Sequence, residues 1–143
     1  MIYKFRGKTK NGKWLYGSLM NWKSGPSILT ETEPDVVSQE PVLTDTVGQF
    51  TGLHEKNGKA IYEGDIVSFS EFDHRGVIQF AYGVFGINFD YANSQNPLNK
   101  EGKLYGAWGQ NHNLRKIDDD EMLSEIIKIG NIHDNPELMP VST

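Results

Sequence analysis

The sequence contains no cysteine among its 143 residues. This absence excludes disulfide bonds, a thiolate nucleophile and any zinc or iron–sulfur site built on cysteine. A chain of this length can bury a core without such cross-links, since single domains typically run about 100 to 150 residues. The simplest interpretation is an intracellular protein that folds by packing alone.

Long hydrophobic runs are also missing. No stretch approaches the roughly 18 apolar residues that a membrane-spanning helix needs. The N-terminus, MIYKFRGKTKNGK, alternates charged and aromatic residues instead of forming the apolar centre of a secretory signal. We therefore expect a soluble, cytoplasmic protein with no membrane partner.

Local motifs for catalysis are absent as well. The sequence has no phosphate-binding glycine loop, no nucleophile elbow and no dinucleotide fingerprint. Its four histidines show neither H-x-H nor H-E-x-x-H spacing. We expect no enzyme activity, no cofactor and no locally encoded metal site. An enzyme would need His54, His74 or His112 to meet a carboxylate in space.

Two charged clusters each have a structural and a chemical interpretation. Residues 71–75, EFDHR, could form an acid–base pair, although a charged tip between two strands explains them as well. Residues 118–121, DDDE, do not fit a calcium loop, which places its acids at alternate positions around a glycine. They suit the start of a short helix over 118–125.

The sequence does contain β-strand patterns, and helix signals are few. The only other helical turn is expected at 135–139, where Asn135 would cap and Pro136 begins the turn. Residues 75–91 alternate, with Ile78, Phe80 and Tyr82 on one strand face, and a late strand follows from Ile126. Tight reversals between such strands predict an all-β fold with minor α content.

The tetrapeptide Lys-Asn-Gly-Lys occurs twice, around Asn11-Gly12 and around Asn57-Gly58. Asn-Gly is the preferred pair for a two-residue type I′ turn, in which both residues take a positive φ. We therefore predict two similar hairpins. After the second, Gly64-Asp65 interrupts the strand, and Asp65 is expected to accept a hydrogen bond in an Asx-turn.

The composition of two segments predicts long mobile loops. Residues 24–44 carry Pro26, Pro34 and Pro41 among serine, threonine and acids, which favours a surface loop with at most short edge strands. Residues 90–104 form the second. The predicted fold is a small, partly open β-barrel of two or three hairpins in a single domain, 1–143, or two small sub-barrels that share a core. Its closure rests on bends at Gly64, Gly76 and Gly86.

The charge is unevenly distributed along the chain, although its net value is only −5. Residues 1–30 contain six cations and no carboxylate, whereas the remaining 113 residues hold 8 cations and all 19 acids. Three interpretations are open: a basic face for nucleic acid, two sheet edges that attract each other, or neighbouring subunits that meet head to tail.

The N-terminal strand is the candidate nucleic-acid site. Alternate residues of an extended strand lie about 6.6 Å apart on one face, a spacing close to that of successive phosphates. Small barrels bind single strands with such cations and stacking rings, although lysines also protect edge strands from aggregation. The candidate nucleic-acid-binding residues are Lys4, Arg6, Lys8, Lys10, Trp14 and Trp22.

Three segments resemble the YopX-like family of phage and prophage proteins. They are IYKFRGKTKNGKWLYG at the start, TVGQFTGLHEKNGKAIYEGDIV in the centre and IIKIGNIHDNPELM near the end. The resemblance implies a small all-β protein of partly open barrels in a bacterial host cell. No activity, cofactor or catalytic residue is established for the family, so it assigns no site.

These observations lead to two functional hypotheses. The first is a phage-encoded, non-enzymatic binding or assembly module that acts through a protein partner or through self-association as a homo-oligomer. The alternative is a nucleic-acid-binding protein that uses the basic N-terminal strand.

Overall fold

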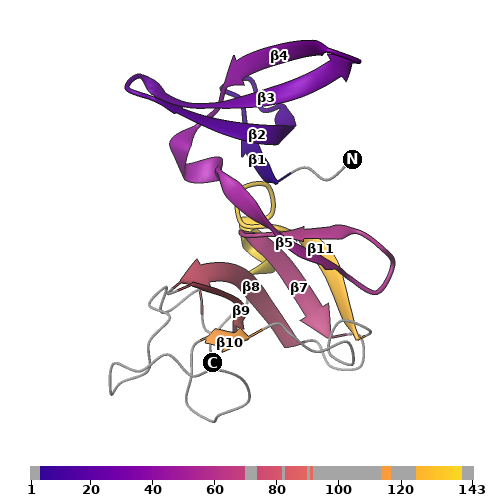
Figure 1. The fold of residues 1–143 in the computed structure, drawn as a ribbon. Helices are drawn as coiled ribbons and strands as arrows, with labels where there is room; N and C mark the ends of the chain where they lie inside the picture. Colours follow the sequence, from indigo (N-terminus) through magenta and orange to yellow (C-terminus); the bar gives the residue numbers. More distant parts are fainter. Residues whose placement is uncertain are drawn as a thin grey trace. The chain divides into compact units, whose positions relative to one another are not determined.

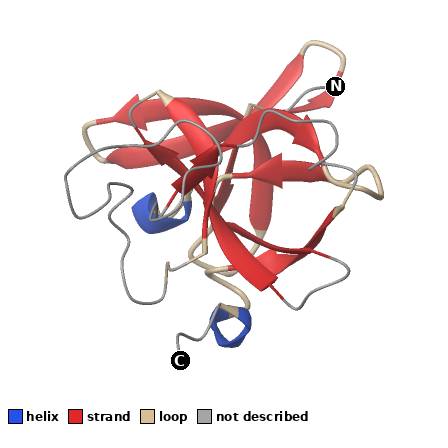
Figure 2. Cartoon of the chain, turned by 90° about the horizontal axis from the view of Figure 1, so that it is seen from below, coloured by secondary structure: helices blue, strands red, loops and turns tan. Residues whose placement is uncertain are grey.

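The computed structural model describes residues 4–69, 74–81, 83–89, 91, 114–116 and 125–139. Within this part the chain is mostly strand, with short 3-10 turns (Figures 1 and 2). The strands form two open antiparallel sheets, which confirms the prediction of a partly open all-β fold with little helix. No helix among the described residues is long and apolar enough to cross a bilayer.

The backbone divides into two compact units, Met1–Phe50 and Thr51–Thr143. We call them the N-terminal and the C-terminal unit. Each has its own cluster of buried apolar side chains. The suggestion that two sub-barrels share a core stays a prediction.

In the N-terminal unit β1 to β4 form an antiparallel meander, and β5 pairs with the free side of β1, which gives the order β4-β3-β2-β1-β5. Strand β5 continues into the C-terminal unit, where β6 is its other neighbour. The core of the N-terminal unit contains Leu15, Ile28 and Val42, with Phe5 packed against them. The elements are β1 (Phe5–Lys8), β2 (Trp14–Trp22), β3 (Gly25–Glu33), β4 (Val36–Pro41), the 3-10 turn η1 (Thr44–Thr46) and β5 (Gly48–His54).

Strand β2 changes its partner at Gly17. Its first half pairs with β1, from Lys8↔Trp14 to Phe5↔Gly17, and its second half pairs with β3, beginning at Ser18↔Leu29. The backbones approach closely at this point: a Cβ on Gly17 would lie 1.9 Å from the carbonyl oxygen of Leu29. Only glycine permits that approach, so β2 can carry one hairpin on each side.

The predicted loop over 24–44 is wrong, because most of this segment forms the hairpin β3–β4. Its prolines occupy positions where a missing N–H is tolerated: Pro26 and Pro41 lie near strand ends and Pro34 lies in the turn. Asp35 follows Pro34 with φ of 65°, as position i+2 of a type II turn requires. The three prolines therefore delimit two strands rather than exclude them.

Two similar hairpins are present, as predicted, but their turns are not type I′. Neither Asn11 nor Asn57 has a positive φ, whereas Gly12 and Gly58 do. In both turns the glycine N–H donates to a carbonyl three residues earlier, that of Thr9 or Glu55. Each is a three-residue loop, a type I turn followed by a left-handed glycine, so the asparagine never needs the left-handed region.

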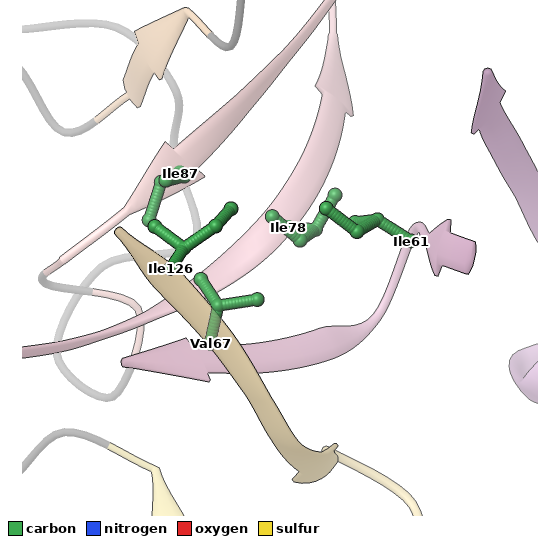
Figure 3. Packing of buried hydrophobic residues seen from close by; sticks show 5 residues of the cluster. All are labelled: Ile61, Val67, Ile78, Ile87 and Ile126. Carbon is green, nitrogen blue, oxygen red and sulfur yellow. The ribbon is translucent and has the colours of Figure 1, made fainter. Parts of the chain in front are cut away.

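The C-terminal unit contains the five-stranded sheet β10-β9-β8-β7-β11. Its core is built from one residue each of β6, β7, β8, β9 and β11, whose side chains point toward one another in Figure 3: Ile61, Val67, Ile78, Ile87 and Ile126. The elements are β6 (Ala60–Tyr62), β7 (Asp65–Phe69), β8 (His74–Ala81), β9 (Val84–Asn88), β10 (Leu114–Lys116), β11 (Ile126–Asn131) and the 3-10 turn η2 (Pro136–Leu138).

The predictions for this unit have mixed outcomes. The late strand from Ile126 is confirmed as β11, and η2 begins at Pro136 as expected. Asn135 does not cap η2 with its side chain; its Oδ1 accepts a hydrogen bond from the Asn131 N–H, 3.3 Å away. The predicted helix over 118–125 lies outside the described residues up to its last position, and the predicted loop over 90–104 is described only at Tyr91.

The three glycines at which bends are predicted have different surroundings. Gly64 takes a positive φ of 93° at the reversal between β6 and β7. Gly76 lies inside β8, where a Cβ would come within 2.2 Å of the Ile87 side chain. Gly86 lies within β9, paired with Gln79. Gly76 thus makes room for core packing.

We predict that Gly17→Ala destabilises the N-terminal unit by at least about 2 kcal/mol, because the clash is with a backbone oxygen that cannot rotate away. Urea unfolding followed by tryptophan fluorescence measures this. Gly12→Ala is the matched control: its Cβ would meet nothing closer than 3.8 Å, so only the cost of its positive φ, about 1–2 kcal/mol, is expected. Equal losses in the two variants would contradict the close approach at Gly17.

Candidate functional site

Four side chains gather on one face of the β1–β2 hairpin. The register pairs Arg6 with Tyr16 and Lys8 with Trp14, and paired residues share a face of an antiparallel sheet. The guanidinium carbon of Arg6 lies 4.9 Å from the centre of the Trp14 ring, and the Lys8 Nζ lies 6.0 Å from it. We call these four residues the cation–aromatic face. The core-facing residues of the same strands include Phe5 and Leu15.

The cation–aromatic face differs from the predicted row of exposed cations. Arg6 is only 1% exposed, so its charge is not presented to a phosphate backbone. The Trp14 ring is half-buried and has the protein's own cations over it. These cation–π contacts stabilise the hairpin by about 0.5–2 kcal/mol each, and a base cannot stack on ring surface that they cover.

The remaining predicted nucleic-acid residues are scattered. Lys4 is exposed just before β1, and Lys10 is exposed in the β1–β2 turn, beyond the strand. Trp22 is 48% exposed, but it ends β2, about 26 Å along the strand from Trp14 at the usual rise per residue. The structure therefore brings together Arg6, Lys8 and Trp14, and leaves Lys10 and Trp22 at opposite ends of β2.

The backbone of Lys8 is fixed by the segment after β4. The Lys8 N–H donates to the Thr46 hydroxyl over 2.8 Å, and its carbonyl accepts from the Leu43 N–H, also at 2.8 Å. The Thr46 hydroxyl donates in turn to the Leu43 carbonyl. This ties the end of β1 to η1 and holds the β1–β2 turn in place.

Sequence reasoning missed the exposed apolar side chains of the N-terminal unit. Val36 and Val37 are 48% and 59% exposed, and Leu43 is 47% exposed. The two valines begin β4, which is the outermost strand of its sheet. Exposed valines are not notable in a predicted surface loop, so the loop prediction for this segment gave no reason to single them out. The available signal is the pair of β-branched residues directly after Pro34-Asp35, a combination that turn chemistry allows to start a strand.

In the C-terminal unit, Lys128 joins two buried carboxylates. Its Nζ lies 3.1 Å from an Asp65 oxygen and donates to the Ala60 carbonyl, while its backbone N–H donates to Glu55. Asp65 is fully buried and also accepts from the Tyr62 N–H over 2.7 Å. We call Glu55, Asp65 and Lys128 the polar clamp. The predicted Asx-turn at Asp65 is wrong, since its carboxylate bonds backward across the β6–β7 reversal.

Glu55 organises the second Asn-Gly turn. Its carboxylate accepts hydrogen bonds from the N–H groups of Asn57 and Lys59, the role that the Thr9 hydroxyl plays for Lys13 in the first turn. Burial raises the pKa of Glu55, but the backbone N–H groups of Lys59, Lys128 and Asn57 and the nearby Lys59 charge outweigh it. The pKa therefore lies below its ordinary value, and the group stays ionised.

The histidines considered for catalysis or metal binding lie in different parts of the chain. His54 is exposed at the end of β5, and His133 lies half-buried after β11. The imidazole of His74 and all of His112 lie outside what the structure describes, as do 71–73 and 118–121. Among the described residues, no three acidic or histidine side chains lie close enough to hold a metal ion.

A family model described as YopX protein matches residues 4–140. The chain belongs to the YopX family. Protein EF1440 from Enterococcus faecalis, a solved structure, is similar over 97% of this chain and 99% of its own, with 22% sequence identity and a TM-score of 0.49. No curated protein gives a significant match.

The segments that resemble YopX-like proteins serve folding in this YopX family member. The central segment contains Glu55 and Asp65, and the last contains Lys128. The polar clamp therefore connects these two segments with hydrogen bonds and with an ion pair between partly buried Lys128 and buried Asp65. These contacts add to the backbone pairing of β7 with β11.

We predict that Lys128→Met lowers the unfolding free energy of the YopX chain by about 3 kcal/mol, because it leaves the buried Asp65 carboxylate without its cationic partner. Adding Asp65→Asn should recover at least about 1 kcal/mol, since the buried charge is gone. Chemical unfolding followed by circular dichroism tests both. Lys56→Met, in the exposed second turn, is the control and should change stability by less than about 0.5 kcal/mol. Strictly additive single-variant losses would rule out the coupling.

A second prediction concerns pH. The folded pKa of Glu55 lies below its ordinary 4.5, so on acidification the unfolded chain binds a proton first and unfolding is favoured. The stability difference between wild type and Glu55→Gln should be about 1–3 kcal/mol at pH 7. It should shrink as the pH falls below 4.5 and through the folded value. A difference that is constant over this range would show that the carboxylate charge is unimportant.

Proposed function

We propose that this YopX family member is a phage- or prophage-encoded, non-enzymatic binding or assembly module. It acts in the bacterial cytoplasm through protein surfaces, including self-association. The family match supports the link to phage proteins through the resemblance described above. The surface of the N-terminal unit supports the binding role.

The exposed edge of the meander carries this proposal. Strand β4 is the outermost strand and begins with Val36 and Val37, both about half exposed or more. An outermost strand offers backbone N–H and C=O groups for pairing with another chain, and proteins usually protect such edges. Covering a valine contributes about 1.5–3 kcal/mol when burial is complete. Pro34 lies in the turn before β4 and Pro41 is its last residue, so the two prolines limit the pairing to a short segment.

Nucleic-acid binding is the second candidate. Exposed Lys4 and Lys10 and half-exposed Trp22 favour it. The burial of Arg6 weakens it, because a buried guanidinium releases no counterions from a phosphate backbone.

Affinity capture from a bacterial host lysate, with and without nuclease, distinguishes the two candidates. A protein-binding module should retain the same captured proteins after nuclease treatment, and Val37→Asp on the β4 edge should abolish capture. Asn57→Asp, in the exposed second turn, is the control and should retain it.

Capture that disappears with nuclease would favour the nucleic-acid candidate. In that case Lys4→Gln, Lys8→Gln and Lys10→Gln should each weaken binding to single-stranded DNA. Each substitution that removes a phosphate-binding lysine should also reduce the slope of the salt dependence by about one unit. A chain that is monomeric at high concentration and captures no protein would contradict the binding module.

A further inference from the structure

Opposite charges are separated along the N-terminal unit more sharply than along the whole chain. Residues 1–23 contain six cations and no carboxylate, and residues 24–50 contain five carboxylates and no cation. The fold turns this division into two surface features. We call residues 8–14 the lysine turn, which includes Lys10 and Lys13, and residues 30–38 the acidic ribbon, which includes Glu31, Glu33 and Asp35.

The acidic ribbon extends beyond the sheet that supports it. The pairing of β3 with β2 ends at Ser18↔Leu29, while β3 and β4 continue to pair with each other as far as Glu33↔Val36. Residues 31–37 are all exposed. A two-stranded ribbon on its own is only marginally stable in water, and this one presents three carboxylates beside two exposed valines.

The tip of the lysine turn, residues 10–13, is exposed, and its base is hydrogen-bonded. The Thr9 N–H donates to the Lys13 carbonyl, and the Lys13 N–H donates to the Thr9 hydroxyl, which fixes the loop. Lys10 and Lys13 are exposed, and Trp14 follows directly. Turns alternate between the two ends of an antiparallel meander, so the β1–β2 and β3–β4 turns belong to the same end of this unit.

We infer that the acidic ribbon of one copy docks on the lysine turn of a second copy. Lys10 and Lys13 of the turn and Glu31, Glu33 and Asp35 of the ribbon are exposed. In the described part of the chain no ion pair joins these lysines to these carboxylates, so their charges are available to another chain. Because both lie at the same end, one two-fold contact satisfies both copies at once. The valines of the ribbon add apolar contact beside the charges. The inference rests on the proposed assembly function and identifies the binding partner as a second copy of this chain.

Charge reversal with mixing tests the pairing. The ribbon variant is Glu31→Lys with Glu33→Lys, and the turn variant is Lys10→Glu with Lys13→Glu. In sedimentation velocity, each variant alone should associate about a hundredfold more weakly than wild type, because like charges then face each other. A one-to-one mixture should associate again, since each reversed surface meets its complement. A chain that carries all four substitutions should also associate.

Matched controls lie in the C-terminal unit. Lys56→Glu occupies the second Asn-Gly turn at the position equivalent to Lys10, and Glu137→Lys reverses an exposed acid of η2. Neither should change association. The far-ultraviolet circular dichroism of each variant reports whether it is folded, and association in the mixture shows independently that both variants present intact surfaces.

Several outcomes would overturn the inference. The first is a wild-type chain that stays monomeric between about 1 µM and 1 mM, the range in which weak interfaces associate. The second is that the charge-reversal variants associate as strongly as wild type. The third is that the mixture of the two variants stays monomeric. Monomeric wild type that binds single-stranded DNA through Lys10 and Lys13 would assign the lysine turn to nucleic acid. Monomeric wild type that still captures host protein would leave the proposed function standing and remove only the second copy as partner.

Discussion

The close backbone approach at Gly17 is the constraint on which the N-terminal unit depends. Because no Cβ separates Gly17 from the Leu29 carbonyl, β2 can pair with β1 along one half and with β3 along the other. This change of partner leaves the far end of β3–β4 paired only with itself. Figure 1 shows β2 between its two hairpin partners. The exposed ribbon is thus a consequence of how one strand is shared between two hairpins, and the cation–aromatic face lies on the half of β2 that pairs with β1.

The two units use charge differently. In the C-terminal unit, Glu55 and Asp65 are buried and Lys128 is partly buried, and all three bond backbone groups or each other, so their charges hold strands together. In the N-terminal unit, Arg6 is buried against Trp14, while Lys10, Glu31 and Glu33 stay exposed. Removing one partner of a buried ion pair strongly destabilises a protein, whereas exposed charges contribute little to folding stability. The exposed charges are therefore the ones available for binding.

Turn chemistry made much of the fold predictable from the sequence. Gly12 and Gly58 located both hairpins, and the isoleucines from Ile126 located β11. The predicted turn type was wrong, because the Asn-Gly pair alone does not reveal the length of the loop. Thr9 and Glu55 each accept a side-chain hydrogen bond from the N–H four residues later, which closes a three-residue loop. The loop prediction for residues 24–44 was wrong because proline occurs at strand ends as well as in loops. For the candidate site, spacing placed Arg6 and Lys8 on one strand face, but it could not show that Trp14 joins them or that Arg6 is buried beside the Trp14 ring.

The central claim is that complementary charges at one end of the N-terminal unit bring two copies together. Sedimentation velocity of the wild-type chain across ionic strength tests it most directly, because screening acts on exposed charges and leaves apolar contacts intact. The account predicts dimers at about 0.02 M salt that dissociate progressively toward about 0.5 M. A chain that is monomeric throughout, or whose association is unchanged or stronger at high salt, would contradict it.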